Sequence, residues 1–284
     1  MAISASMVKE LREKTGAGMM DCKKALEECE GSIEGAVDWL RQKGLSKAAK
    51  KAGRATSEGL IASSMSADGK TATLVEVKCE TDFVARNENF IELTKKIAKM
   101  ADEANGINDT IQTLITDSIA TVGENMGVGR YVKFALEGEG VLGNYIHSNG
   151  KIAVLVAMNC ESAAGAANAA FVECAKNVAM QIAAANPAAV CAAELDPALL
   201  DREREVYRQK AREDGKPEQI IEKIVEGAVK KFYKEACLLE QPYIRDDKQT
   251  IQDLLNATGK ALGEKVSVAR FVRLQLGEDN AAEA

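Results

Sequence analysis

The chain has 284 residues, of which 28% are charged, and its formal net charge is -6. A chain of this length can bury a sizeable core, divided between two or more domains. The negative charge argues against a general nucleic-acid-binding protein, and no apolar run approaches the ~20 residues that span a bilayer. We therefore expect neither a direct nucleic-acid partner nor a membrane partner.

The N-terminal residues have neither the apolar core of a signal peptide nor the acid-poor character of a transit peptide. The seven cysteines are odd in number, scattered along the chain, and form no Cys-x-x-Cys pair. This pattern is typical of reduced thiols in a cytoplasmic protein. With His147 as the single histidine, the usual zinc-ligand sets are excluded, and we expect no metal and no cofactor.

Residues 1–55 predict a separate helical domain. Serines that can cap a helix and glycines that can end one divide it into three short segments. The helices are expected over residues 4–12, 21–29 and 32–44, with Gly44 closing the last. Residues 47–54 then indicate a basic helical linker, whose charges we expect to form a solvated face.

A strand followed by a helix is predicted next. Residues 71–77 are rich in β-branched side chains, and residues 87–105 carry apolar side chains at the i, i+3 and i+4 spacing of an amphipathic helix. The sequence Thr81-Asp82-Phe83-Val84 therefore falls on the turn that leads from one to the other. Aromatic residues make up only 4% of the chain, so a phenylalanine beside a carboxylate on a turn is an informative feature.

The chain repeats itself from Glu58 onward. Residues 69–80 return as residues 150–161, 81 positions later, and about a third of the positions between Glu58 and Asn105 are identical in the two copies. A second echo relates Arg130-Tyr-Val-Lys to Arg270-Phe-Val-Arg. Each copy predicts strand, strand, helix, helix, strand, with the helices on one face of a small antiparallel sheet. The fold class is therefore α+β, with core subdomains over residues 56–138 and 139–278.

The second copy is longer because it holds an insertion at about residues 190–245. Two charged, helix-favouring segments, 197–212 and 218–236, flank a turn that contains Gly215 and Pro217. We expect an antiparallel helical hairpin that projects from the second sheet and makes contacts. Residues 279–284 follow as an acidic tail.

The repeat also serves as an internal control for the turn at Phe83. In one interpretation Phe83 enters the core and Asp82 helps to cap the next helix. In the other, both side chains face a partner. The second copy carries Ala164 where the first carries Phe83, which shows that the scaffold does not need a large ring there and favours the outward interpretation. Cys79 and Cys160, by contrast, coincide within their strands and are expected to be packing residues.

The common sequence motifs of enzymes do not fit this chain. Residues 138–143 match G-x-G-x-x-G, but predicted strands flank them on both sides, whereas a dinucleotide site requires a helix directly afterwards. A phosphate-binding G-x-x-x-x-G-K-[ST] loop and a recognisable serine-histidine-carboxylate spacing are both missing from the sequence. We therefore expect a binding protein that presents an Asp-Phe wedge, not an enzyme.

Two segments resemble the signatures of the translation elongation factor Ts family. They are residues 11–26, Leu-Arg-Glu-Lys-Thr-Gly-Ala-Gly-Met-Met-Asp-Cys-Lys-Lys-Ala-Leu, and residues 76–86, Glu-Val-Lys-Cys-Glu-Thr-Asp-Phe-Val-Ala-Arg. The resemblance extends from about Ser4 to Gly277. It implies a ubiquitin-associated-like three-helix domain, two related core subdomains and a projecting helical hairpin. It also implies a guanine-nucleotide exchange factor whose partner is elongation factor Tu.

The resemblance further implies the roles of individual residues. Thr81, Asp82, Phe83 and Val84 would insert into the nucleotide-binding domain of the partner and disturb its magnesium site. Further contacts would come from Arg12, Met19, Met20, Lys23 and His147, although the two methionines could instead be core residues. Two other interpretations stay open: an interaction adaptor or chaperone-like module without exchange activity, and, remotely, an enzyme that uses the glycine-rich turn.

Overall fold

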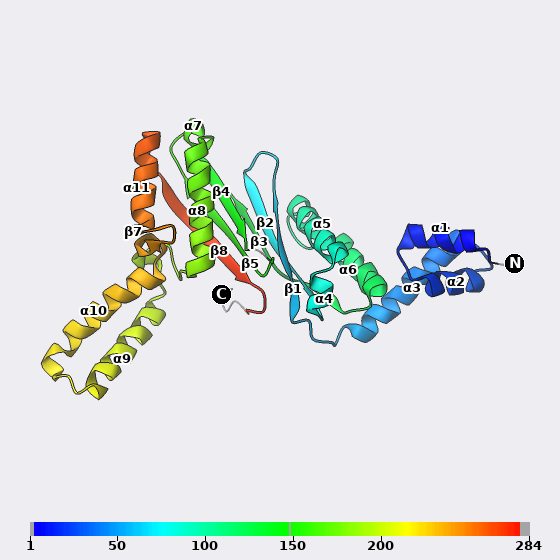
Figure 1. The fold of residues 1–284 in the computed structure, drawn as a ribbon, viewed down its shortest axis with the longest axis horizontal. Helices are drawn as coiled ribbons and strands as arrows, with labels where there is room; N and C mark the ends of the chain where they lie inside the picture. Colours follow the sequence, from blue (N-terminus) through cyan, green and yellow to red (C-terminus); the bar gives the residue numbers. More distant parts are fainter. Residues whose placement is uncertain (1–2, 148, 279–284) are drawn as a thin grey trace.

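The computed structural model describes residues 3–147 and 149–278, so the acidic tail predicted at 279–284 lies outside the described residues. The molecule is elongated, with an N-terminal group of helices at one end, a helical hairpin at the other, and two sheets between them (Figure 1). Both the helices and the antiparallel sheets agree with the predicted α+β class.

The N-terminal unit contains three helices: α1 (Ala5–Thr15), α2 (Met19–Glu28) and α3 (Ile33–Lys51). The side-chain oxygens of Ser4 and Ser32 accept hydrogen bonds from the backbone N–H groups of Met7 and Gly35, which caps α1 and α3. The core between the helices is formed by residues that are fully buried: Leu11, Cys22, Ala25, Leu26 and Ala36.

Helix α3 corrects the prediction that Gly44 ends the third helix. It continues through Gly44 to Lys51 and packs on α6 (Asp109–Val122) of the next unit. A Cβ atom at Gly44 would lie 3.0 Å from the Cβ of Ala120, so the glycine permits the close approach of the two helices. The glycine therefore reflects tertiary packing and not a helix end.

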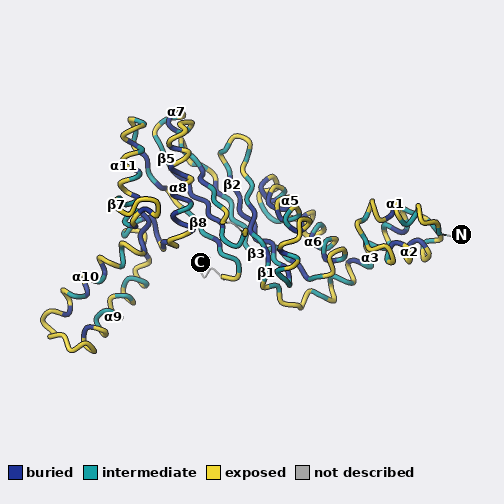
Figure 2. Tube along the Cα trace, in the orientation of Figure 1, coloured by how far each residue is buried: buried dark blue, intermediate teal, exposed yellow. Residues whose placement is uncertain are grey.

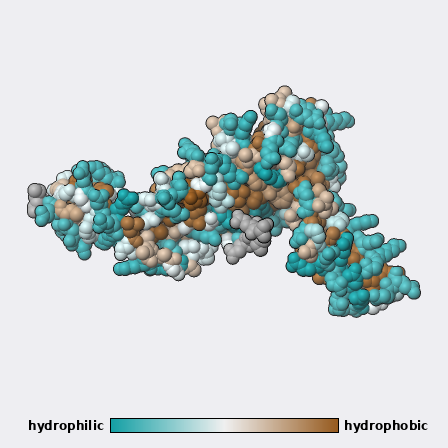
Figure 3. All heavy atoms as spheres, turned by 180° about the vertical axis from the view of Figure 1, so that it is seen from behind, coloured by the Kyte–Doolittle hydropathy of each residue, from teal (hydrophilic) through white to brown (hydrophobic). Residues whose placement is uncertain are grey.

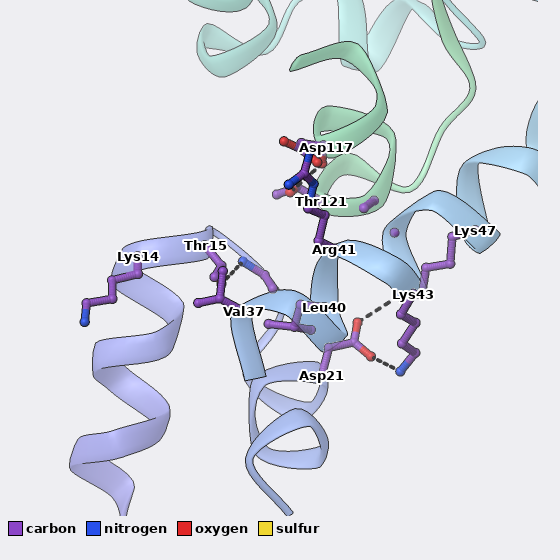
Figure 4. A pocket seen from close by; sticks show the side chains of 13 residues that line it. Lys14, Thr15, Asp21, Val37, Leu40, Arg41, Lys43, Lys47, Asp117 and Thr121 are labelled. Atoms are coloured by element: carbon purple, nitrogen blue, oxygen red, sulfur yellow. Dashed lines mark hydrogen bonds and ion pairs between the residues drawn. The ribbon is translucent and has the colours of Figure 1, made fainter. Parts of the chain in front are cut away.

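Several basic side chains along α3 form ion pairs and hydrogen bonds and are not simply solvated, contrary to the expectation for the linker. Lys43 and Lys47 lie 3.0 Å and 2.9 Å from the two carboxylate oxygens of Asp21, as Figure 4 shows. Hydrogen bonds from Lys47 and Lys43 hold the pKa of Asp21 below its ordinary value. The Lys51 ammonium group donates to the carbonyl of Gly123, at the end of α6. These contacts join the N-terminal unit to the core through one continuous helix.

The first sheet consists of β1 (Glu58–Met65), β2 (Thr71–Cys79) and β3 (Met126–Ala135), all antiparallel in the order β1-β2-β3. Between β2 and β3 the chain forms α4 (Asp82–Ala85), α5 (Glu88–Ala104) and α6. Phe90, Ile97 and Ile111 project from the two longer helices into the core that they share with the sheet. The predicted order of strand, strand, helix, helix, strand is confirmed, and the turn predicted before the first helix forms the additional four-residue helix α4.

The second sheet repeats this plan with β4 (Gly140–Ile146), β5 (Ile152–Asn159) and β8 (Ser267–Gln275), covered by α7 (Ala163–Ala166), α8 (Ala169–Ala185) and α11 (Ile251–Leu262). The register is the same in both copies. Leu60 pairs with Val77 in the first sheet, and their equivalents Val141 and Met158 pair in the second. The repeat found in the sequence is thus a repeat of structure.

The two sheets pack against each other through the faces that the helices leave free. Leu74 and its equivalent Leu155 are both 0% exposed within this shared core. Equivalent polar residues also meet, since the amide of Asn144 donates to the hydroxyl of Ser63 at 2.8 Å. The core of the molecule is therefore a four-layer arrangement, helices-sheet-sheet-helices, in which the two copies face each other. This packing of the two sheets was not predicted from the sequence.

Two equivalent arginines tie the sheets together at their edges. Arg130 donates to the carbonyl of Gln275 at 2.6 Å, and Arg270 donates to the carbonyl of Ala135 at 3.1 Å. Arg130 also forms a 2.9 Å ion pair with Glu76, which is 0% exposed. Burial would raise the pKa of Glu76, but the hydrogen bonds from Arg130 outweigh burial and keep that pKa below its ordinary value. The pair therefore stabilises the fold above the pKa of an unfolded glutamate, and its contribution is lost as the pH falls.

The insertion forms the predicted hairpin of α9 (Pro197–Glu213) and α10 (Glu218–Ala236). Ala211, Ile221, Val225 and Val229 are buried along its seam, and Arg208 on α9 forms a 2.7 Å ion pair with Glu222 on α10. Short elements at its base complete the structure: the 3₁₀ turns η1 (Ala192–Glu194) and η2 (Leu238–Glu240), and the strands β6 (Pro242–Tyr243) and β7 (Asp246–Thr250).

Burial follows the architecture. In Figure 2 the buried residues run along the sheets and the inner faces of their helices, whereas the hairpin and the N-terminal helices are exposed along much of their length. The view from behind in Figure 3 shows apolar residues reaching the surface mainly over the central region. Interaction surfaces are therefore to be sought near the sheets as well as on the outlying helices.

Replacing residues 197–233 of the hairpin by a short Gly-Ser linker should leave both sheets folded. The hairpin has its own buried seam, and the first copy folds around its sheet without an equivalent. Differential scanning calorimetry should show a cooperative transition for the shortened protein, as for the full chain. Loss of that cooperative transition would contradict the independence of the hairpin.

Gly44→Leu should destabilise the junction between α3 and α6. The new side chain has to be accommodated where even a Cβ would lie 3.0 Å from Ala120, and overpacking of this kind costs ~1–3 kcal/mol. Gly227→Leu is the matched control, because Gly227 is an exposed helical glycine with nothing within 4 Å of a built Cβ. Urea unfolding should show lower stability for Gly44→Leu alone. Equal losses in both variants would contradict the packing role of Gly44.

Candidate protein-interaction site

The turn after β2 forms the four-residue helix α4, and it presents Phe83 to solvent. The hydroxyl of Thr81 caps α4 by accepting from the N–H of Val84 at 3.3 Å. Phe83 is 83% exposed. The alternative that placed Phe83 in the core is therefore wrong, and so is the capping role for Asp82, because Thr81 caps α4 and Asn87 caps α5.

The outward direction of Phe83 follows from how α4 is anchored. Ala85 is buried and Val84 packs partly against the core of the first sheet, so one side of the single turn is fixed to the scaffold. Phe83 is left on the other side. Asp82 is half-buried and forms a 3.0 Å ion pair with Arg86, one helical turn later. The ring is thus carried on a short rigid support and flanked by charged groups.

Glu124 holds the start of α4 from outside. Its carboxylate accepts from the backbone N–H of Thr81 at 3.0 Å and from the Thr81 hydroxyl at 2.7 Å. Glu124 is not among the site residues predicted from the sequence. A signal was available, because Gly123-Glu124 recurs as Gly263-Glu264 in the second copy.

The equivalent turn in the second copy has the same support without the aromatic ring. Ser162 caps α7, and Glu264 accepts from both the backbone N–H and the hydroxyl of Ser162. At the position of Phe83 this copy has Ala164. The two turns therefore differ in what they present and not in how they are built.

The two equivalent cysteines also belong to this support. The thiols of Cys79 and Cys160 donate to the carbonyls of Thr81 and Ser162, both at 3.3 Å. Burial, and secondarily the negative charge of Glu124, raises the pKa of Cys79 to about 12, which makes its thiol a poor nucleophile. The packing role expected for Cys79 agrees with this geometry, whereas the expectation that Cys160 lies buried within its strand is wrong, because Cys160 is only half-buried and follows the end of β5 at Asn159.

A groove of about 730 Å³ runs beside α4. One wall carries Asp82 and Arg86, and the other is formed by Ile146 at the end of β4 and by Asn149 in the loop between β4 and β5. His147 lies in this loop; it is exposed, and its ring nitrogen lies 3.1 Å from the hydroxyl of Tyr145. Since the groove spans both copies, the packing of the sheets brings the loop of His147 to the same region as Asp82.

The other candidate residues gather on the N-terminal unit. Arg12, Met19, Met20 and Lys23 line a second, largely apolar groove of about 560 Å³ between α1 and α2. Met19 is 60% exposed and Met20 is 75% exposed. The alternative that these methionines are core residues is therefore wrong. The groove lies on a separate unit from α4, so the candidate residues fall into two surfaces.

Within residues 3–147 and 149–278, no group of three or more His, Cys, Asp or Glu side chains is arranged to hold a metal ion. In the same part of the chain no helix is long and apolar enough to cross a membrane. The G-x-G-x-x-G match at residues 138–143 runs into the strand β4, and the next element after β4 is the strand β5 and not a helix.

Comparison with known proteins agrees with these features. The family model described as elongation factor TS matches residues 80–278. An elongation factor Ts of Nitratidesulfovibrio vulgaris strain DP4 is 70% identical over 283 residues, covering 100% of this chain and 99% of the relative. Those of Desulfovibrio desulfuricans and Lawsonia intracellularis are 56% and 54% identical, each over 98% of this chain and 99% and 100% of the relatives. A relationship of this extent, over the sheets, the hairpin and α4 alike, places the chain in the elongation factor Ts family.

Proposed function

We propose that this protein is a guanine-nucleotide exchange factor for elongation factor Tu and that it acts in the cytoplasm. It binds the GDP-bound partner, accelerates release of GDP and so permits exchange for GTP, without making or breaking a covalent bond. The observation that carries the proposal is Phe83, an aromatic side chain 83% exposed on a rigidly held turn, in a chain of the elongation factor Ts family.

The wedge consists of Thr81, Asp82, Phe83 and Val84. Its proposed action is to insert Phe83 into the nucleotide-binding domain of the partner, next to the partner's magnesium ion. Mg²⁺ requires near-octahedral oxygen coordination at short distances and is held largely by phosphates, so small displacements of its surroundings weaken its binding. Asp82 would bring a carboxylate to the same region. By linkage, a wedge that stabilises the nucleotide-free partner weakens GDP binding by the same factor.

The groove on the N-terminal unit supplies a second contact in this proposal. Met19 and Met20 offer adaptable apolar surface, and Arg12 and Lys23 offer positive charge beside it. His147, on the loop across the groove from Asp82, is proposed to touch the partner as well. An adaptor without exchange activity would use the same surfaces, and addition of catalytic amounts to labelled Tu·GDP distinguishes the two: only an exchange factor accelerates release.

Phe83→Ala should slow GDP release without changing the fold. As a central exposed aromatic at an interface, its loss should cost on the order of 2 kcal/mol of partner stabilisation, roughly thirtyfold in equilibrium. The melting temperature should barely change, because the ring has little packing to lose. Asp82→Ala should act in the same direction. Stopped-flow release of a fluorescent GDP analogue and thermal unfolding, on the same sample, check both statements.

Phe90→Ala is the matched control for this prediction. Phe90 is 1% exposed in the core of the same subdomain, and truncation of a buried phenylalanine costs ~3–5 kcal/mol. It should therefore lower the melting temperature strongly. If Phe83→Ala behaved like Phe90→Ala in unfolding and left saturating release unchanged, the wedge mechanism would be wrong.

Removing residues 1–42 should weaken binding to Tu more than it slows release at saturating factor. The deletion takes away the groove of Met19 and Met20 but keeps the part of α3 that packs on α6. Titration calorimetry and release kinetics separate the two effects. Met19→Ser with Met20→Ser tests the groove in the full chain, and both residues are exposed enough to be replaced without loss of stability. Normal affinity in both proteins would exclude the N-terminal contact.

A further inference from the structure

Helix α4 is too short to hold its own shape. A single turn of four residues forms few internal hydrogen bonds, and isolated helices of this length are unstable in water. Its internal bonds run from the N–H of Ala85 to the carbonyl of Thr81 at 3.2 Å and from the N–H of Arg86 to that of Asp82 at 3.0 Å. The direction of Phe83 therefore depends on whatever fixes the first residue of the turn.

Glu124 is placed to fix it. Its carboxylate holds both the backbone N–H and the hydroxyl of Thr81, so it orients the capping group itself. The neighbouring residues form the reciprocal contact, in which the carboxylate of Glu80 accepts from the N–H of Asn125 at 2.5 Å. Hydrogen bonds to a carboxylate are shorter and stronger than neutral ones. Two adjacent residues on each segment thus clamp the end of β2 to the start of β3.

The backbone of Glu124 is itself held on both sides. Gly123 before it ends α6 in the left-handed conformation, with φ of 88°, and Lys51 of α3 donates to its carbonyl. Met126, two residues after it, pairs with Cys79 in the first sheet. The carboxylate therefore projects from a rigid position, and Thr81 is tied to the scaffold and not to a loop.

We propose that Glu124 is the positioning residue of the wedge. By holding Thr81 it orients α4, so that Phe83 already points in its binding direction before the partner arrives. This inference rests on the proposed exchange function. Without Glu124, α4 would sample several orientations, and the fraction with Phe83 correctly directed would fall. The apparent strength of the wedge falls with that fraction.

The second copy provides the control. Glu264 makes the same contacts with Ser162, but α7 carries Ala164 in place of the aromatic ring. Removing Glu264 removes an equivalent support from a turn that has no proposed contact with the partner. An effect of Glu124 that is merely structural should be reproduced by Glu264, and an effect on the wedge should not.

The experiment compares Glu124→Ala, Glu124→Gln and Glu264→Ala in the full chain, by release of a fluorescent GDP analogue from Tu. Glu124→Ala should slow saturating release about tenfold, the scale of a lost charge-assisted hydrogen bond. Glu124→Gln keeps one accepting oxygen in place of two and should recover part of the rate. Glu264→Ala should match the unchanged protein. Hydrogen exchange of the free proteins should be faster at Ala85 and Arg86 in Glu124→Ala only.

A double-mutant cycle with Phe83→Ala separates positioning from general damage. If Glu124 acts through the ring, Glu124→Ala has no further effect once Phe83 is removed. Additive losses, or an equal loss in Glu264→Ala, would overturn the positioning role. Normal release in Glu124→Ala beside slow release in Phe83→Ala would overturn it and leave the wedge intact. Normal release in Phe83→Ala would overturn the wedge, and the positioning role with it.

Discussion

The face-to-face packing of the two sheets is the constraint on which the rest of the structure depends. Each sheet covers one face with its own helices and buries the other against its copy, through Leu74 on one side and Leu155 on the other. Burial of apolar side chains holds the two sheets together, and the arginines at the sheet edges fix how one sheet is oriented on the other. Because the sheets are locked together, α4 of one copy and the loop of His147 in the other border a single groove.

The two copies share the residues that build the scaffold and differ in the residues that they present at the surface. The strand register, the capping serine or threonine, the supporting glutamate and a thiol that donates to the capping residue recur in both copies, which marks them as requirements of the fold. The differences concentrate where a surface is presented: Phe83 against Ala164, and the hairpin that only the second copy carries. The buried Glu76–Arg130 pair is a third difference, since Ala157 stands opposite Arg270 at the same register.

Much of this could be predicted from the sequence, because local patterns control helices and strands. The repeat gave the order of elements, and the comparison of Phe83 with Ala164 correctly indicated an exposed ring. The features that were missed depend on contacts between distant segments. Gly44 resembles a helix end until α6 is known to lie against it, and Glu124 is one carboxylate among many until the start of α4 is seen 43 residues earlier in the chain. The mutual packing of the sheets leaves no periodic signal that distinguishes a partner sheet from a layer of helices.

The continuity of α3 has a consequence for how a partner could be held at two places. Its 19 residues form a rod roughly 28 Å long, at 1.5 Å per residue, with the methionine groove attached at one end and the core packed along the other. A flexible linker would let the two surfaces search independently and would spread their separation over many values. A rigid helix fixes that separation at a single value. If a partner touches both proposed surfaces, engagement of one would present the other at a high effective concentration, and only a partner of matching dimensions would contact the two at once.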